Sequence, residues 1–289
     1  MMSTPPTPAP HFAPVAAAGP DRYAVIGHPV AHSKSPRIHA AFARQTGEDL
    51  SYEALLAPLE GFRQTVAAFV RAGGRGANVT VPFKLEAHGV ATQLSLRAAQ
   101  AGAVNTLKFS GDEAFGDNTD GLGLVRDIDH QGVALGGARV LVIGAGGAAR
   151  GVLGPLLERR PARLAVAARR KGKAIELARL FTARIDPLTL DELPAGGFDI
   201  VINATSASLD GATLALPEGL FEHTALAYDM MYGAAPTPFL VDARARGARA
   251  IADGLGMLVE QAAESFLLWR GVLPDTAPGL AALRQEMAA

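Results

Sequence analysis

The segment from Arg139 to Ala149 constrains the fold more narrowly than any other part of the 289-residue sequence. Residues 139–143 (RVLVI) form a short apolar run, as expected of a parallel strand that is covered on both faces. The run leads into GAGGAA, which matches the pattern G-x-G-x-x-G/A, and a helix to residue 157 is expected to follow. Such a turn binds the pyrophosphate of a dinucleotide at the helix N-terminus. The predicted phosphate loop is Gly144, Ala145, Gly146, Gly147 and Ala148, and the alternative is a glycine-rich turn without a ligand.

The next expected strand, residues 164–168, ends in three cations, Arg169, Arg170 and Lys171. In sites for NAD, an acidic residue at this place binds the ribose 2′-hydroxyl, whereas an arginine accommodates the 2′-phosphate of NADP. Guanidinium groups bind phosphate in a bidentate manner, so three cations without an acid favour NADP. The alternative is a basic strand end that is only solvated, because surface cations are common.

The composition permits about two domains with a buried core, since 49% of the residues are hydrophobic and 19% are charged. A net charge of −1 provides no basic surface for nucleic acid or for an anionic membrane, so we expect neither as a partner. The absence of cysteine excludes disulfides and thiolate metal sites and agrees with a cytoplasmic protein. Residues 1–20 are rich in proline and alanine and are predicted to form a disordered tail.

Strands and helices alternate along the rest of the chain. The first block has expected strands at 22–27, 51–56, 76–81 and 105–109, with helices at 36–46, 59–72, after 84 and at 95–101. The second block has expected strands at 139–143, 164–168, 200–203, 225–229 and 248–252, with helices at 122–131, to 157, 173–182, 238–245, 257–269 and 278–287. This order predicts an α/β fold of two domains with mostly parallel sheets, the second of them a Rossmann-like, doubly wound dinucleotide-binding domain.

The stretch ANVTVPFK (residues 77–84) is unusual for a strand, because a proline removes a ladder donor and one long cation follows a phenylalanine. We predict that Pro82 and Phe83 fix the exit from the strand so that Lys84 points into a cleft. The alternative is a solvated lysine at a strand end, since lysines are rarely buried.

Four short polar segments lie at expected strand ends or loops of the first block: Ser33-Lys34-Ser35, Asn78 and Thr80 with Lys84, Asn105-Thr106, and residues 117–121 (DNTDG). Ligands of α/β sheets bind outside the carboxyl ends of strands, so these side chains are expected to converge. They suit a small polyol that carries a carboxylate. Each has an alternative: Ser35 caps a helix, Asn105 satisfies a turn, and Thr119 or Asp120 caps the following helix.

Taken together and in this order, SKSPRIH, NVTVPFK, GAVNT, DNTDG, GAGGAARG, NATS, DMMY and DGLGMLVEQA resemble the shikimate dehydrogenase family over about residues 22–272. The resemblance implies NADPH-linked reduction of 3-dehydroshikimate to shikimate, a step toward chorismate and the aromatic amino acids. It implies a catalytic pair of Lys84 and Asp120, and it implies substrate contacts from Ser33, Ser35, Asn78, Thr80, Asn105, Tyr232 and Gln261. The cofactor contacts implied beside the phosphate loop are Arg169, Arg170, Lys173, Thr205, Met230 and Gly254.

The resemblance also implies how the chain is divided. Residues 21–120 together with 254–289 are predicted to form the substrate domain and residues 121–253 the NADP-binding domain, with Gln261 on a helix that returns to the first domain. No metal is expected, because Pro29 prevents His28 and His32 from lying on one helix face. The expected partner is a small-molecule substrate, and the chain is expected to be a monomer or a homodimer.

The sequence departs from the family pattern after the second cofactor strand, where Ala168-Arg169-Arg170 replaces the frequent Asn-Arg-Thr. Three alternative functions remain at this stage: a quinate/shikimate dehydrogenase with relaxed substrate or cofactor choice, a dehydrogenase of an amino analogue, and a non-catalytic NADP-sensing protein. Both Lys84 and Asp120 are present, which argues against the last.

Overall fold

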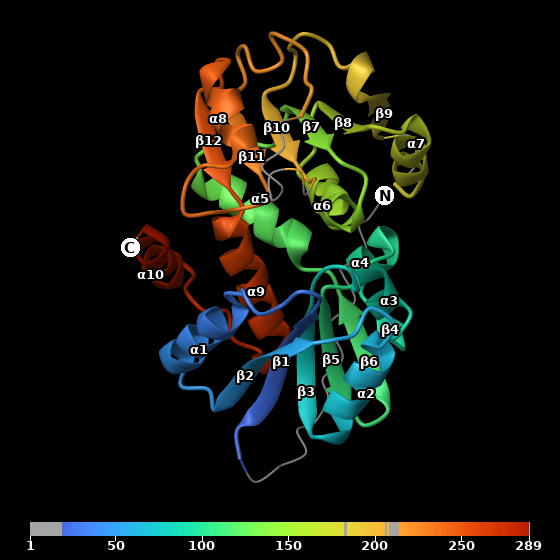
Figure 1. The fold of residues 1–289 in the computed structure, drawn as a ribbon, viewed down its shortest axis with the longest axis vertical. Helices are drawn as coiled ribbons and strands as arrows, with labels where there is room; N and C mark the ends of the chain where they lie inside the picture. Colours follow the sequence, from blue (N-terminus) through green and yellow to red (C-terminus); the bar gives the residue numbers. More distant parts are fainter. Residues whose placement is uncertain (1–18, 182–183, 206, 208–213, 289) are drawn as a thin grey trace, which may run out of the picture.

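The computed structural model describes residues 19–181, 184–205, 207 and 214–288. Two six-stranded sheets lie one above the other and are joined in the middle by helices α5 and α9 (Figure 1). Most of the tail predicted at residues 1–20 lies outside the described residues. The predicted α/β class with a doubly wound second half is confirmed.

The first sheet has the strand order β2-β1-β3-β5-β6-β4. Its strands are β1 (Asp21–Gly27), β2 (Leu50–Leu56), β3 (Gly74–Val79), β4 (Gln93–Leu94), β5 (Thr106–Ser110) and β6 (Glu113–Asp117). The predicted mostly parallel sheet is confirmed in three of its five pairings, whereas β5 runs antiparallel to both β3 and β6, which was not predicted. A short turn, with Gly111 in the left-handed region, closes the β5–β6 hairpin that the sequence analysis missed.

The helices of this first part are α1 (Ser35–Thr46), α2 (Phe62–Arg71), α3 (Lys84–His88) and α4 (Leu96–Ala101). Strand β3 ends two residues earlier than predicted, and a turn in which the Phe83 N–H donates to Thr80 O leads into α3. Phe83 is fully buried and stacks on Phe62 with 4.9 Å between ring centroids. This anchored ring fixes the position of Lys84, the next residue.

The second sheet has the order β12-β11-β10-β7-β8-β9, and every pairing in it is parallel. Its strands are β7 (Arg139–Ile143), β8 (Arg163–Ala168), β9 (Asp186–Thr189), β10 (Ile200–Asn203), β11 (Leu226–Asp229) and β12 (Ala250–Asp253). The other elements are α6 (Gly147–Glu158), α7 (Lys171–Arg179), α8 (Pro238–Ala245) and a 3-10 turn at Leu190–Glu192. Side chains from both faces of β7 are buried, as the apolar run predicts.

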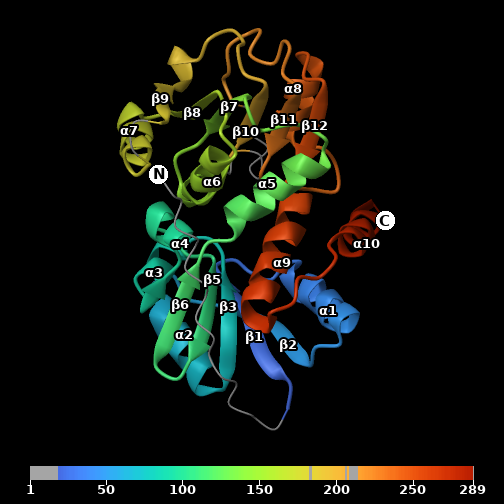
Figure 2. The same ribbon diagram turned by 180° about the vertical axis from the view of Figure 1, so that it is seen from behind.

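Three helices lie between or beside the sheets: α5 (Asp120–His130), α9 (Leu255–Arg270) and α10 (Ala277–Ala288). Helix α9 leaves the end of β12, packs on α5, and reaches α1, β3 and β5 of the first part (Figure 2). Near its end, the Trp269 indole donates to Leu107 O at 3.0 Å. Within the described ranges, no helix could span a membrane.

Candidate active site

The side chains of Lys84 and Asp120 meet between β3 and α5. Lys84 Nζ donates to Asp120 Oδ2 at 2.5 Å, and the two side chains are 19% and 7% exposed. Lys84 is the first residue of α3, whereas Asp120 is the first residue of α5. The structure therefore joins the two residues of the predicted catalytic pair from segments that are far apart in sequence.

Asn105 connects this pair to helix α9. Its Nδ2 donates to Asp120 Oδ1 at 2.7 Å and to Gln261 Oε1 at 3.2 Å. Its Oδ1 accepts the Thr119 backbone N–H at 2.9 Å, and a backbone amide is always a donor, so the orientation of the Asn105 side chain is fixed. Thr119 precedes α5 but makes no capping bond with its side chain, which contradicts the capping alternative for that residue.

The other acid of the DNTDG segment has a structural task. The Asp117 carboxylate accepts Arg97 Nε at 2.7 Å and the Ser95 hydroxyl at 2.5 Å. Asn118 Oδ1 accepts the Asp120 backbone N–H at 3.2 Å. Asp117 and Asn118 therefore shape the turn that presents Asp120, and only Asp120 reaches Lys84.

The two serines predicted to bind a carboxylate lie at the start of α1. The Ser35 backbone N–H donates to Ser33 Oγ at 3.3 Å, which places the two residues side by side. Ser35 lies in the first turn of α1, and the capping position is held by Lys34 without a side-chain bond. The prediction that Ser35 caps this helix is therefore wrong, and the residue stays a candidate for ligand binding.

Tyr232 reaches the same region from the second sheet. It follows β11 and packs against a hydrophobic cluster to which α1 and α9 both contribute side chains. Burial raises the pKa of Tyr232 above its ordinary value, and the nearby Asp253 carboxylate acts in the same direction. The phenol is therefore a hydrogen-bond donor at neutral pH, beside the helix that carries Ser35.

The phosphate loop has the form that a dinucleotide requires. Gly144 has φ +122°, and a Cβ there would lie 3.0 Å from Ala204 O, so only glycine fits. A Cβ at Gly146 or Gly147 would meet nothing within 4 Å. Among the described residues no side chain caps helix α6, so its first backbone N–H groups are available to a pyrophosphate.

The basic end of β8 contains two arginines without acidic partners. In the described part of the chain, neither Arg169 nor Arg170 forms an ion pair with a carboxylate, and both are exposed. Lys171 instead pairs with Glu192, and Lys173 Nζ lies 2.7 Å from Glu176 Oε2. The arginines are therefore the better candidates for the 2′-phosphate, and the predicted contact from Lys173 requires release from Glu176.

The residues predicted at the nicotinamide end are neighbours in space. The Met230 N–H donates to Asn203 O at 2.9 Å, and the Gly254 N–H donates to Met231 O at 3.1 Å. A Cβ at Gly254 would lie 2.2 Å from Met230 O, so this approach also requires glycine. Thr205 donates from both its N–H and its hydroxyl to Asn203 Oδ1, at 3.0 and 2.7 Å.

Sequence reasoning missed Tyr52 and Ser265, which bind the predicted substrate contact Asn78. The Tyr52 hydroxyl donates to Asn78 Oδ1 at 2.7 Å, and Asn78 Nδ2 donates to Ser265 Oγ at 2.8 Å. Ser265 lies one helical turn after Gln261, so helical spacing could have revealed it. Thr80, which follows Asn78, donates its backbone N–H to Ile26 O.

A histidine that is fully buried lies behind this cluster. His39 stacks on Tyr52 with 4.2 Å between ring centroids. Burial lowers the pKa of His39 to about 3, and neither ring nitrogen has a hydrogen-bond partner within the described residues. His39 is therefore neutral in the folded protein at neutral pH.

We expect the free energy of unfolding to fall by about 2 kcal/mol more in the wild type than in His39→Phe when the pH is lowered from 7.5 to 5. The folded-state pKa of about 3 lies below the ordinary value, so the unfolded chain binds a proton first as the pH falls. The stability from this histidine is complete above about pH 6.5 and is lost toward pH 3. Urea unfolding of both proteins at the two pH values measures the difference, and equal losses would contradict the assignment.

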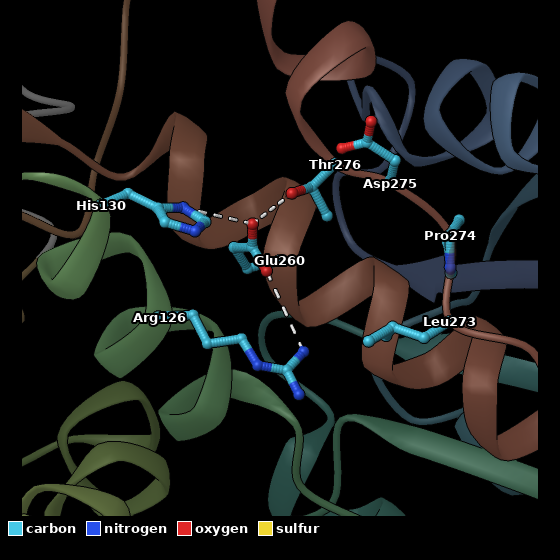
Figure 3. Close-up of a pocket in the computed structure, with 7 residues that line it drawn as sticks. All are labelled: Arg126, His130, Glu260, Leu273, Pro274, Asp275 and Thr276. Carbon is cyan, nitrogen blue, oxygen red and sulfur yellow. Dashed lines mark hydrogen bonds and ion pairs between the residues drawn. The ribbon is translucent and has the colours of Figure 1, made fainter.

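A cavity of about 290 Å³ lies elsewhere, between α5, α9 and the segment before α10 (Figure 3). The Glu260 carboxylate there accepts the Thr276 hydroxyl and lies 3.5 Å from His130 Nδ1 and 4.0 Å from Arg126 Nη1. Its charge is compensated locally, and none of the predicted site residues lines the cavity. In the described ranges no group of three or more His, Asp or Glu side chains could hold a metal ion.

The fold and the site together define a two-part α/β dehydrogenase, with a dinucleotide half and a polar Lys–Asp site on the other half. Three family models match: a shikimate dehydrogenase substrate binding domain at residues 25–107, a shikimate / quinate 5-dehydrogenase at 127–213, and a shikimate 5'-dehydrogenase C-terminal domain at 254–284. The shikimate dehydrogenase (NADP(+)) of Aromatoleum aromaticum is 62% identical, over 92% of this chain and 98% of its own length. The chain therefore belongs to the shikimate dehydrogenase family.

Two solved structures show the same fold. An Ael1 enzyme from Pseudomonas putida is 46% identical with a TM-score of 0.87, over 91% of this chain and 98% of its own. The shikimate 5-dehydrogenase of Thermus thermophilus in complex with NADP(H) and shikimate is 37% identical with a TM-score of 0.83, over 92% of this chain and 99% of its own.

Proposed function

We propose that the protein catalyses the reversible, NADPH-linked reduction of 3-dehydroshikimate to shikimate, in the route to chorismate and the aromatic amino acids. The observation that carries this proposal is the contact of 2.5 Å between Lys84 Nζ and Asp120 Oδ2, made beside a dinucleotide-binding half. Family membership supports it, since the 62% identical relative bears the name shikimate dehydrogenase (NADP(+)).

Reduction of a ketone requires a hydride and a group that neutralises the developing alkoxide. Bound NADPH supplies the hydride. Lys84 donates a hydrogen bond and then a proton from Nζ to the carbonyl oxygen, and in the reverse direction it accepts the hydroxyl proton. Asp120 holds the ammonium group through Oδ2, while Asn105 holds Oδ1 of the same carboxylate.

The other end of the substrate is assigned to α1 and the loop before it. The hydroxyls of Ser33 and Ser35 bind the carboxylate, as hydrogen-bond donors suit an anion. The ring hydroxyls are bound by Asn78, Thr80, Asn105, Tyr232 and Gln261. The clustering of Tyr232 with α1 supports a site shared by both halves of the molecule.

The cofactor is assigned to the second half, because the backbone at Gly146 and Gly147 fits a pyrophosphate, and Arg169 and Arg170, exposed and without an ion pair among the described residues, fit a 2′-phosphate. Arg169 and Arg170 are the proposed 2′-phosphate ligands, with Lys173 at their side. Thr205, Met230 and Gly254 are proposed at the nicotinamide end. Residues 121–253 form the proposed NADP-binding domain, and residues 21–120 with 254–289 form the proposed substrate domain.

The proposed substrate is a small molecule. We assign the protein to the cytoplasm and expect it to be a monomer or a homodimer. The absence of cysteine from the whole sequence supports a reducing compartment.

Purified protein tested with shikimate or quinate, and with NADP or NAD, decides the activity. We expect shikimate with NADP to give the highest kcat/KM, because the basic end of β8 suits a 2′-phosphate. The measurement is the rise of the reduced nicotinamide absorbance. Absence of turnover with shikimate would refute the proposal, and faster turnover with quinate and NAD would replace it with the quinate alternative.

A further inference from the structure

A tyrosine that lies outside every motif binds the centre of the polar network. Tyr52 lies on β2 and Asn78 on β3, the strands on either side of β1. The Tyr52 hydroxyl donates to Asn78 Oδ1 at 2.7 Å across the intervening strand. Burial raises the pKa of Tyr52 well above its ordinary value, so its hydroxyl keeps the proton that it donates.

The direction of the Tyr52–Asn78 hydrogen bond follows from the neighbouring hydrogen bonds, the first of which is donated by a backbone amide. The Thr119 N–H donates to Asn105 Oδ1 at 2.9 Å, which fixes that oxygen as an acceptor. The Thr106 hydroxyl donates to the same oxygen at 2.8 Å. Thr106 Oγ1 therefore offers a lone pair to Asn78 Nδ2, which lies 3.1 Å away.

The helix side of the network imposes the same orientation. The Ser265 hydroxyl donates to Gln261 O at 3.1 Å, so its oxygen accepts Asn78 Nδ2 at 2.8 Å. With Nδ2 directed to α9 and β5, Asn78 Oδ1 is directed to β2, where Tyr52 is its donor. The orientation of the Asn78 amide thus depends on one phenol at one end and on Thr106 and Ser265 at the other.

The position of the Tyr52 ring is also defined. It stacks on His39 with an interplanar angle of 7°, and His39 is fully buried. The ring is therefore held against His39, and its hydroxyl is directed to Asn78.

We propose that Tyr52 is a positioning residue: its hydroxyl fixes the Asn78 amide, which ties the strand leading to Thr80 and Lys84 to the helix that carries Gln261. This inference rests on the proposed function. Without the phenol hydroxyl, Asn78 Oδ1 loses its donor and the amide is held only through Nδ2, by Asn105 O, Thr106 and Ser265, which loosens the spacing between Lys84 and Gln261.

The test is a double-mutant cycle of Tyr52→Phe and Asn78→Ala, with the wild type and the double variant. We expect Tyr52→Phe alone to lower kcat/KM for shikimate by about five- to thirty-fold, as for one buried hydrogen-bonding group left without its partner. The KM for NADP should stay unchanged. In the Asn78→Ala background, Tyr52→Phe should lower kcat/KM by less than about two-fold, because the two residues act as one unit.

The chain offers a matched control in Tyr23, which pairs with Tyr52 in register across the β1–β2 ladder. Its ring is buried and stacks on Trp269, and its hydroxyl accepts from Arg270 at 3.4 Å; among the described residues Tyr23 has no hydrogen bond to Asn78. Tyr23→Phe should keep kcat/KM within about two-fold of the wild type. Equal activity losses in both phenylalanine variants would overturn the positioning role and indicate a general packing effect.

Turnover and urea unfolding of the same four proteins together separate the two proposals. Wild-type protein without shikimate turnover refutes the proposed function, whereas an active wild type with an unaffected Tyr52→Phe refutes only the positioning role. Coupling between Tyr52 and Asn78 must also appear in the free energy of unfolding. Additive effects there overturn the inference even for an inactive enzyme.

Discussion

Replacing Lys84 with alanine is expected to lower kcat by about 10²- to 10⁴-fold, the usual contribution of a general acid or base. The ammonium group lies 2.5 Å from Asp120 Oδ2 and follows the anchored Phe83 ring, and alanine removes both the proton donor and this contact. The KM for shikimate should change less, because the proposed ligands of the carboxylate and the ring hydroxyls remain. Steady-state rates with saturating shikimate and NADP measure the effect.

Two further variants show whether the proton or the size of the side chain matters. Lys84→Met keeps most of the volume without a titratable group and should be as slow as Lys84→Ala. Lys108→Ala removes another partly buried lysine, which lies on β5 and whose Nζ donates to Leu268 O at 2.9 Å. This variant should keep kcat within a few-fold of the wild type. A Lys84→Ala enzyme that turns over within a few-fold of the wild type would refute the assignment.

The fold could be predicted wherever local pattern decides the structure. Strand β7 is a continuous apolar run followed by a turn in which Gly144 cannot be another residue type, and its position was predicted to the residue. Strand β6 was missed because Glu113–Asp117 is short and holds two acids, so its apolar content gives no clear period. The antiparallel direction of β5 depends on that hairpin, so it was not predicted either.

The site shows the same limit at the level of single side chains. Motifs located Lys84, Asp120 and Asn105, and the structure brings them together. The sequence could not show that the Asn105 amide is already hydrogen-bonded to Asp120 and Thr119, because those bonds depend on how the residue before β5 meets the start of α5 in the fold. Tyr52 was missed for a similar reason, since it reaches Asn78 across β1 and no spacing along the chain relates the two residues.

Lys173 illustrates the reverse case, in which a local pattern was available. Its ion pair with Glu176 joins residues three apart on α7, a spacing at which helical side chains meet. The Glu176 carboxylate also pairs with Arg150 of α6, so its negative charge is shared between two cations. The two residues before α7, Arg169 and Arg170, are therefore the cations left for a phosphate.

Changing both Arg169 and Arg170 to alanine is expected to raise the KM for NADP by about 100-fold and to leave the KM for NAD nearly unchanged. Two charge-assisted hydrogen bonds to a phosphate contribute about 2 to 4 kcal/mol together, and each factor of ten corresponds to about 1.4 kcal/mol. Neither arginine has a carboxylate partner among the described residues, so no ion pair is lost and folding should be little affected. Initial rates with each cofactor at saturating shikimate give both constants.

The contrast between the cofactors identifies the phosphate as the group that is bound. NAD differs from NADP only in lacking the 2′-phosphate, so a general disturbance of the second half would raise both KM values equally. Arg179→Ala, at the exposed last turn of α7, removes a similar charge without reaching the end of β8 and should change neither KM. Equal losses with both cofactors in the double variant would contradict the phosphate assignment, because a guanidinium that binds a 2′-phosphate has nothing to bind in NAD.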